Sequence, residues 1–388
     1  MLTPADGKLD TTGCRPTWAE IDLDALAQNF HVIKNRVGQS VKVMAIVKAD
    51  AYGHGAVECA RRLVQEGADW FGVELPEEGI ELRAAGITQP ILCLGGFWNG
   101  QAGVCIQEKL VPVVFRLDLI EALDLAARDA GIVAVVHVKI DTGMGRLGIP
   151  FEDVAEFANA LRRFKNIRVD GLMTHFAAAD EPTHETLTKA QIERFEQAVR
   201  LFRDRGHGPT HIHSCNSAGV FSHTEAFGNM VRPGGVLYGL WRDVLPPTTK
   251  KSELRPVMTL HSKIMFLKWA PEGATIGYGG TFKTSRKTLV ATIPIGYDDG
   301  YLRGLSNRSQ VTLRETHAPV IGRISMDLTI LDVTDVVGVE LGDTVTLFGG
   351  DKEMQITVEE LAGIAGTLSY EVTCGIGARV PRLYLPRK

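Results

Sequence analysis

The chain has 388 residues, and its 42 lysines and arginines stand against 46 acidic residues, a formal net charge of −4. This balance excludes the concentrated basic surface of a nucleic-acid binder, and no apolar run approaches the ~18 residues of a membrane span. The N-terminal MLTPADGKLDTTG lacks the basic and apolar regions of a secretory signal, and six scattered cysteines show no CxxC or metal-ligand spacing. We therefore expect a soluble cytoplasmic enzyme with no nucleic-acid or membrane partner.

Residues up to about 240 alternate short β-branched runs with amphipathic helices. Apolar residues spaced three and four apart from Leu23 to Val37 predict a helix, and Asp22 is its expected N-cap. Strands that are apolar on both faces and alternate with helices predict a covered parallel sheet. The eight candidate strands cover residues 41–47, 69–75, 90–94, 111–115, 133–140, 169–175, 210–214 and 230–232. Eight such units favour a closed (β/α)8 TIM-type barrel, with an open sheet of six or seven strands as the alternative.

The composition changes after the proline-rich, polar segment 244–256, which is typical of a linker. Period-two alternation between glycine, aspartate and proline turns predicts antiparallel strands in 288–300, 310–315, 318–335 and 343–350. A short helix is expected at 357–366, followed by strands at 371–377 and 380–385. The prediction is an α/β barrel over residues 16–245 and a mostly-β C-terminal domain over 256–388. Residues 1–15 are expected to form a tail or a strand of the β domain.

Two motifs suggest chemistry that their context does not support. GMGRLG, from Gly143 to Gly148, imitates a dinucleotide-binding turn, but Asp141 and Thr142 separate it from the strand and Pro150 precedes the helix. The THIH segment places His211 and His213 on one strand face, without a third ligand that would complete a metal site. We expect hydrogen-bonded or packed histidines there, and no metal.

Two lysines occupy unusual places. Lys48 directly follows the apolar strand VKVMAIV, and the C-terminal ends of barrel strands face the active site. A partly desolvated lysine there can act as a Schiff-base nucleophile or a general base, and a solvated loop lysine is the alternative. Lys139 lies inside a buried strand, where a free ammonium is costly, and the nearby Arg146 adds a like charge.

Eight motifs in order along the chain closely resemble the alanine racemase family. They are KADAYGHG (48–55), KIDTGMGRLG (139–148), THFAAAD (174–180), NSAG (216–219), RPGG (232–235), GYGGTF (277–282), GRISMD (322–327) and YEVTCGIGARVPR (370–382). The resemblance runs from Trp18 to the C-terminus. It implies a barrel that carries pyridoxal 5′-phosphate (PLP), a C-terminal β domain and a homodimer with shared active sites.

The resemblance assigns the cofactor-binding residues. Lys48 would carry PLP covalently, and Arg232 would face the pyridine nitrogen, where its lack of a transferable proton suits racemisation over transamination. The remaining cofactor-binding residues would be Tyr52, His175, Asn216, Ser217, Gly234, Gly235 and Tyr370. Most members of the family carry a branched aliphatic residue where this chain has Gly235, so this loop is expected to be looser.

The resemblance also implies interconversion of L- and D-alanine, which supplies D-alanine for peptidoglycan. Lys48 and Tyr278 would act as acid and base on opposite faces of the substrate, with His175 linking Tyr278 to Arg232. Arg146, Met326 and Asp327 would lie near the substrate carboxylate, and Lys139 would be carbamylated.

Three other functions are possible. A racemase for serine or lysine is one alternative, because a methyl-sized difference gives only ~1–3 kcal/mol of discrimination. A PLP-dependent decarboxylase of the same fold type is another, and a non-catalytic PLP carrier is the third. Arg232 argues against the decarboxylase, and the β domain argues against the carrier.

Overall fold

The computed structural model describes residues 15–249, 253–350 and 353–386. The chain forms two compact units, one of Leu26–Arg255 and one that joins Met1–Ala25 to Pro256–Lys388. The first unit therefore starts later than residue 16, where the sequence predicts the start of the barrel domain. The expected tail or strand over residues 1–15 lies outside the described residues apart from Arg15.

Eight parallel strands form the centre of the first unit. They are β2 (Lys42–Ile46), β3 (Trp70–Val73), β4 (Ile91–Cys93), β5 (Val111–Val114), β6 (Ala134–Asp141), β8 (Ile167–Met173), β9 (His211–His213) and β10 (Met230–Val231). Their order in space is β10-β2-β3-β4-β5-β6-β8-β9, and the short β7 (Ile149–Pro150) pairs with β6.

Backbone hydrogen bonds beside β9 and β10 bring the two ends of this sheet together. The Asn229 N–H donates to the Ile212 carbonyl at 3.1 Å, and the Arg232 N–H donates to the Cys215 carbonyl at 2.9 Å. The result is a nearly closed eight-stranded parallel barrel, which confirms the predicted barrel over the open sheet.

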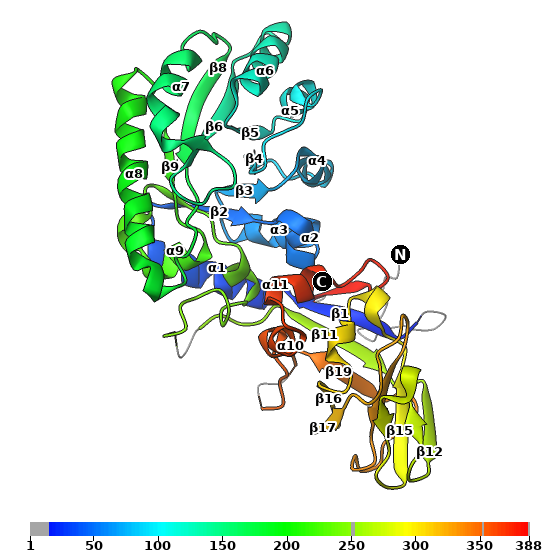
Figure 1. Cartoon of the computed structure of the whole chain (residues 1–388). Helices are drawn as coiled ribbons and strands as arrows, with labels where there is room; N and C mark the ends of the chain where they lie inside the picture. Colours follow the sequence, from blue (N-terminus) through cyan, green and yellow to red (C-terminus); the bar gives the residue numbers. More distant parts are fainter. Residues whose placement is uncertain (1–14, 250–252, 351–352, 387–388) are drawn as a thin grey trace. The chain divides into compact units, whose positions relative to one another are not determined.

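Helices cover the outside of this barrel. They are α1 (Leu23–Val37), α3 (Ala56–Gln65), α4 (Pro76–Ala84), α5 (Ala102–Gln107), α6 (Leu117–Asp129), α7 (Val154–Leu161), α8 (Glu185–Asp204) and α9 (Ser217–Ser222). Figure 1 shows α4 to α8 around the outer side of the strands. The predicted cap of α1 is present, since the Ala25 N–H donates to Asp22 Oδ1 at 2.8 Å.

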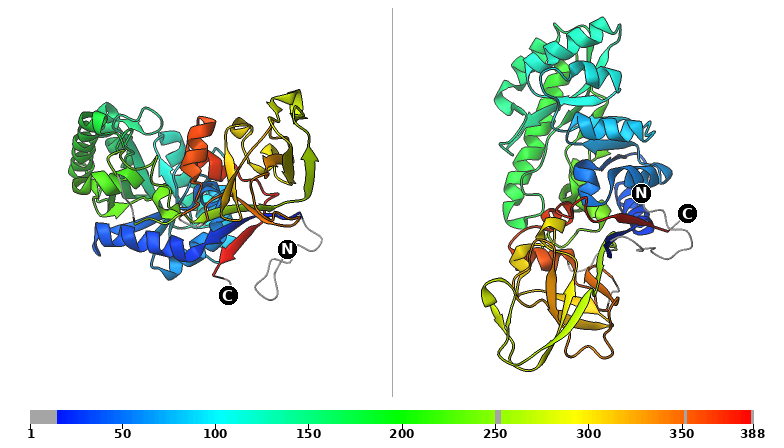
Figure 2. Two further views of the ribbon diagram at one scale, coloured as in Figure 1. Left: turned by 90° about the horizontal axis from the view of Figure 1, so that it is seen from below. Right: turned by 90° about the vertical axis from the view of Figure 1, so that its right-hand side faces the viewer.

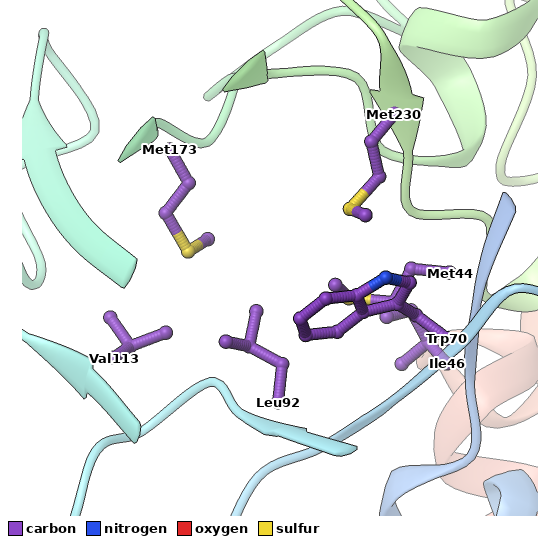
Figure 3. Packing of buried hydrophobic residues seen from close by; sticks show 7 residues of the cluster. All are labelled: Met44, Ile46, Trp70, Leu92, Val113, Met173 and Met230. Atoms are coloured by element: carbon purple, nitrogen blue, oxygen red, sulfur yellow. The ribbon is translucent and has the colours of Figure 1, made fainter. Parts of the chain in front are cut away.

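The interior of the barrel is a packed core. Side chains from six strands meet there, and all are at most 6% exposed: Met44, Ile46, Trp70, Leu92, Val113, Met173 and Met230 (Figure 3). Residues two apart on a strand point to the same face, so Met44 and Ile46 of β2 both enter this cluster. This core stabilises the barrel, and functional groups are expected at the C-terminal ends of its strands.

The second unit is mostly antiparallel sheet, as predicted (Figure 2). Its six-stranded sheet has the order β17-β16-β19-β11-β1-β20, beside sheets β12-β15-β18 and β13-β14. The strands are β1 (Thr17–Asp22), β11 (Met258–Lys263), β12 (Phe266–Ala270), β13 (Thr275–Ile276), β14 (Phe282–Lys283), β15 (Thr288–Ile293), β16 (Gln310–Leu313), β17 (Thr316–Pro319), β18 (Thr329–Asp332), β19 (Thr344–Phe348) and β20 (Arg382–Leu385). The exception to the antiparallel pattern is β1, which pairs antiparallel with β11 and parallel with β20.

One predicted strand is wrong. Residues 371–377 do not form a strand, because Ser369–Cys374 is helix α11, which follows helix α10 (Val358–Ala365). Ser369, Val372 and Thr373 are its buried residues, a spacing of three and four that belongs to a helix face. The β-branched Val372 and Thr373 had suggested a strand, and tertiary burial overrides that propensity.

No helix in the described ranges is both long enough and apolar enough to cross a membrane.

Candidate active site

The predicted site residues of the first unit follow the C-terminal ends of its strands. Lys48 follows β2, His175 follows β8, Ser217 follows β9 and Arg232 follows β10, while Lys139 lies near the end of β6. Parallel strands of a barrel end on the same rim, so the fold gathers these side chains at one mouth.

Lys48 starts helix α2 (Lys48–Gly53), which has an unusual backbone. Ala49, Asp50, Ala51 and Tyr52 all have φ between 52° and 55°, so they form one left-handed helical turn. Each non-glycine residue in this conformation costs about 1–2 kcal/mol. Hydrogen bonds hold the turn, including Ala51 N–H to the Val47 carbonyl at 2.9 Å. Strain of this kind persists where the surrounding structure fixes a functional group.

The Lys48 ammonium has a partner outside the eight motifs. Its Nζ donates to Glu74 Oε2 at 2.9 Å, and Glu74 follows the end of β3. A Cβ on Gly95 would lie 3.0 Å from Glu74 Oε1, so the glycine leaves room for this carboxylate. Glu78 supports both strand ends, because it accepts hydrogen bonds from the backbone N–H groups of Ala49 at 2.7 Å and Glu74 at 2.6 Å. A carboxylate at a predicted strand end was the available sequence signal.

Lys139 is buried among cations. Lys139 is only 5% exposed. The pKa of Lys139 is lowered to about 8, mainly by burial; the Arg146, Arg232 and Lys48 cations act in the same direction, and Glu74 acts against them. Asp141 Oδ1 accepts the backbone N–H groups of Gly143, Met144 and Gly145, at 2.9, 2.9 and 3.1 Å, so this carboxylate closes the GMGRLG loop.

Arg232 is fully enclosed by acceptors. Its NH1 donates to His213 Nδ1 and to the His213 carbonyl, both at 2.8 Å, and its NH2 donates to the carbonyls of Thr174 at 2.6 Å and Ser214 at 2.9 Å. The Nε–H makes none of these four bonds, so it can donate to another group. Burial lowers the pKa of Arg232 to about 10, so the side chain is a cation at neutral pH.

The predicted phosphate-binding residues lie on two neighbouring loops. The Gly234 N–H donates to Ser217 Oγ at 2.9 Å, and Asn216 caps α9 by accepting the Gly219 N–H at 3.0 Å. A Cβ on Gly234 would lie 2.4 Å from Tyr52 Oη, so the glycine allows this close approach of the tyrosine hydroxyl. Gly235 follows at the start of a 3-10 turn.

His175, expected to link Tyr278 to Arg232, is neutral in this environment. Burial is the main cause that holds its pKa well below the ordinary value, and the Arg232 and Lys139 cations act in the same direction. Its carbonyl accepts a hydrogen bond from Gln191 Nε2 at 3.0 Å.

The other predicted residues belong to the second unit. Tyr278 is 72% exposed and sits in a Gly-Tyr-Gly-Gly turn in which Gly277, Gly279 and Gly280 all have positive φ. Met326 is 51% exposed, and Asp327 Oδ1 accepts from Arg379 NH2 at 2.7 Å. Tyr370 lies in α11.

Both units match families of known proteins. The alanine racemase N-terminal domain family matches residues 21–241, and the alanine racemase C-terminal domain family matches residues 257–384. The chain belongs to the alanine racemase family. This membership confirms the resemblance that the eight motifs carry, and it accounts for the order of a barrel followed by a β domain.

Individual members of the family are similar over nearly their whole length. The alanine racemase of Geobacter sulfurreducens is 45% identical over 376 residues, 96% of this chain and 97% of the relative. The solved alanine racemase of Streptomyces lavendulae, which produces D-cycloserine, has a TM-score of 0.90 at 35% identity and covers 96% of this chain and 98% of its own. The alanine racemase of Clostridium difficile 630 gives a TM-score of 0.89 at 37% identity, over 95% and 96% of the two chains.

Proposed function

We propose that this chain interconverts L- and D-alanine with PLP held at the mouth of its barrel. The observation that carries the proposal is the set of groups around Lys48: an amine at a strand end, a buried arginine with a spare donor, and a glycine cradle beside Tyr52. Membership of the family supplies the reaction class, an isomerisation.

The residues present fit PLP. Lys48 supplies the amine for its covalent attachment, and Arg232 can donate its Nε–H to the pyridine nitrogen. Tyr52, with Asn216, Ser217, Gly234 and Gly235 on the loops after β9 and β10, would provide hydroxyl, amide and backbone groups for the phosphate, and the family resemblance adds Tyr370. His175, which follows β8, is the remaining residue of the proposed cofactor site. When bound, PLP withdraws electrons from the substrate α-carbon and makes its hydrogen acidic.

Racemisation then requires one proton carrier on each face of the α-carbon. Lys48 would remove or return the proton on the face of the D-enantiomer, and Tyr278 on the face of the L-enantiomer. An arginine opposite the pyridine nitrogen keeps that nitrogen unprotonated, which favours return of the proton to the α-carbon.

Lys139 is the proposed site of carbamylation. The buried amine has no ion-pair partner among the residues that the structure describes, and its lowered pKa leaves part of it as the neutral amine that reacts with CO₂. The product is an anion that can pair with Arg146, which would then face the substrate carboxylate with the Met326 backbone and Asp327.

We further propose a homodimer in which each site takes Lys48 from one chain and Tyr278 from the other. Tyr278 is 72% exposed and Met326 is 51% exposed, so both side chains are accessible to a partner chain. The free thiols of Cys59, Cys93, Cys105, Cys215 and Cys374 agree with a reducing cytoplasm, where D-alanine enters peptidoglycan synthesis. Cys14 lies outside the described residues.

The alternatives receive less support. A decarboxylase of this fold type would need an acid opposite the pyridine nitrogen, where this chain has the hydrogen-bonded Arg232. A simple PLP carrier lacks the C-terminal domain that matches residues 257–384. Racemisation of serine or lysine is best treated as an outcome of the test below.

The test uses purified protein with PLP and three amino acids. Circular dichroism should show L-alanine losing its optical activity much faster than L-serine or L-lysine, and borohydride should fix PLP to the peptide that contains Lys48. A Lys48→Ala variant should lose both signals. Faster loss with serine or lysine, or label on another peptide, would overturn the substrate or cofactor assignment.

A further inference from the structure

A chain of buried histidines continues from Arg232 into the barrel. The His213 Nδ1 that accepts the Arg232 hydrogen bond has its other ring nitrogen, Nε2, 2.8 Å from His137 Nδ1. An arginine can only donate, so His213 Nδ1 carries no proton and His213 must be protonated on Nε2. His137 Nδ1 must then accept, which places the proton of His137 on its own Nε2.

A glycine is built into β8 to make this contact possible. β8 lies between β6 and β9, and Gly171 is the residue of β8 that pairs with His137 in the ladder. A Cβ at this position would lie 2.5 Å from His137 Cγ and Nδ1. The ring of His137 therefore crosses β8 above Gly171 to reach His213 on β9, a placement that no other residue type allows.

Two nitrogen atoms at the far end of this chain are complementary. His137 Nε2 and His211 Nδ1 are both buried without a hydrogen-bond partner among the described residues, and their rings lie 5.7 Å apart between centroids. His137 Nε2 carries the proton of its ring and is therefore a donor. Asp170 Oδ2 lies 3.6 Å from His211 Nε2 and draws the His211 proton to that nitrogen, so His211 Nδ1 is an acceptor. Trp70 packs against both rings, at 5.2 and 5.1 Å.

We propose that one buried water bridges His137 Nε2 and His211 Nδ1, and that the completed relay from Arg232 through His213, His137 and His211 to Asp170 positions Arg232. A buried donor and a buried acceptor on rings whose centroids lie 5.7 Å apart are the partners such a water needs. Every donor in the relay points toward the Asp170 carboxylate. This anion therefore favours the same tautomers that Arg232 requires, and the relay holds His213 Nδ1 toward Arg232 NH1.

The inference rests on the proposed function, because it assigns the relay to the arginine that would face PLP. The first experiment does not depend on that function. Long-range ¹H–¹⁵N correlation spectra of the cofactor-free protein, labelled with ¹⁵N in its histidine rings, report each tautomer directly. We expect neutral His213 and His137 with the proton on Nε2 from pH 6 to 8, and cross-relaxation between His137 Hε2 and water. A proton on Nδ1 of either ring, a charged ring, or the absence of the water signal would overturn the relay.

The second experiment tests the positioning of Arg232. His211→Phe keeps an aromatic ring beside Trp70 and removes the acceptor, and His223→Phe replaces an equally enclosed histidine, 8% exposed, outside the relay. With PLP bound, His211→Phe should lower kcat about tenfold, the effect of one lost buried hydrogen bond, and leave KM unchanged. His223→Phe should leave kcat unchanged. A lower melting temperature in His211→Phe with unchanged kcat would reduce the relay to a structural role and overturn the positioning claim.

Discussion

At the scale of single residues, buried histidines make the stability of this protein depend on pH. Burial lowers the pKa of His137 to about 3 and holds the pKa of His213 well below its ordinary value, with the Arg232 cation acting in the same direction. Both rings stay neutral in the folded chain, whereas they take up protons in the unfolded chain below pH ~6.5. Their stabilising contribution is therefore complete above that pH and is lost as the pH falls.

The free energy of unfolding should decrease by about 1 kcal/mol for each of these two histidines between pH 6.5 and 5.5. Urea unfolding at pH 7.5, 6.5 and 5.5 measures this directly. A His137→Phe variant should lose about 1 kcal/mol of this pH dependence, and the other buried histidines, His213 and His175 among them, should keep the remainder. Equal stability at the three pH values would contradict the neutral state of the two rings.

Lys139 gives a second test at the level of one residue. ¹³C spectra with labelled bicarbonate should show a carbamate, because the amine is buried, partly neutral and close to Arg146. Lys139→Ala should lose activity, and small carboxylates should restore part of it by supplying the missing anion. Full activity without added carboxylate would remove Lys139 from the site.

Most of the residues proposed for the site could be predicted from the sequence, whereas the sequence signal for Glu74 is not specific. Lys48 and Arg232 stand in motifs whose order and spacing are specific to the family. Glu74 stands in a segment that resembles any strand end, and its contact with Lys48 depends on the register of β2 and β3. The relay also needed the structure, because the closeness of His137 and His213 follows from Gly171 on a third strand.

At the scale of elements, the left-handed turn of α2 lowers the stability of the fold while it positions Lys48. Its four residues with positive φ hold Lys48 at the strand end, where a right-handed turn would direct the chain elsewhere. No sequence pattern predicts such a turn, since alanine, aspartate and tyrosine all prefer negative φ. The same limit applies to α11, where buried contacts and not propensity select the helix.

Ala49→Gly should stabilise the protein by about 1 kcal/mol, because glycine adopts this φ without the steric cost of Cβ. Ala49 is exposed, so no packing is lost. The matched control is Ala126→Gly in the right-handed helix α6, which should destabilise by about 1 kcal/mol. Thermal unfolding of both variants gives the comparison, and a loss of stability in Ala49→Gly would argue against the left-handed turn.

At the scale of the whole molecule, the two units carry different halves of the proposed site. Lys48 and Arg232 belong to the barrel, whereas Tyr278, Met326 and Asp327 belong to the β unit. A two-fold dimer with shared sites makes both sites equivalent and composite.

Complementation between inactive variants tests the shared site. Lys48→Ala and Tyr278→Ala homodimers should each be nearly inactive. After unfolding and refolding as an equal mixture, about half of the dimers should be hybrids, each with one site that carries both changes and one that carries neither. Roughly a quarter of wild-type activity should return. Activity near the parental background, with hybrids confirmed by mass, would show that each site is built within one chain.

The position of β1 has a consequence for the order in which the protein is made. This strand is synthesised before the barrel, yet it lies between β11 and β20, whose residues follow the whole barrel. At ~5–20 residues per second, β1 waits roughly 20 to 70 s before Leu385 is joined to the chain. The barrel has all of its residues first and can form during translation. The β unit instead can close only once β20 has been made, around a strand that was synthesised before the barrel.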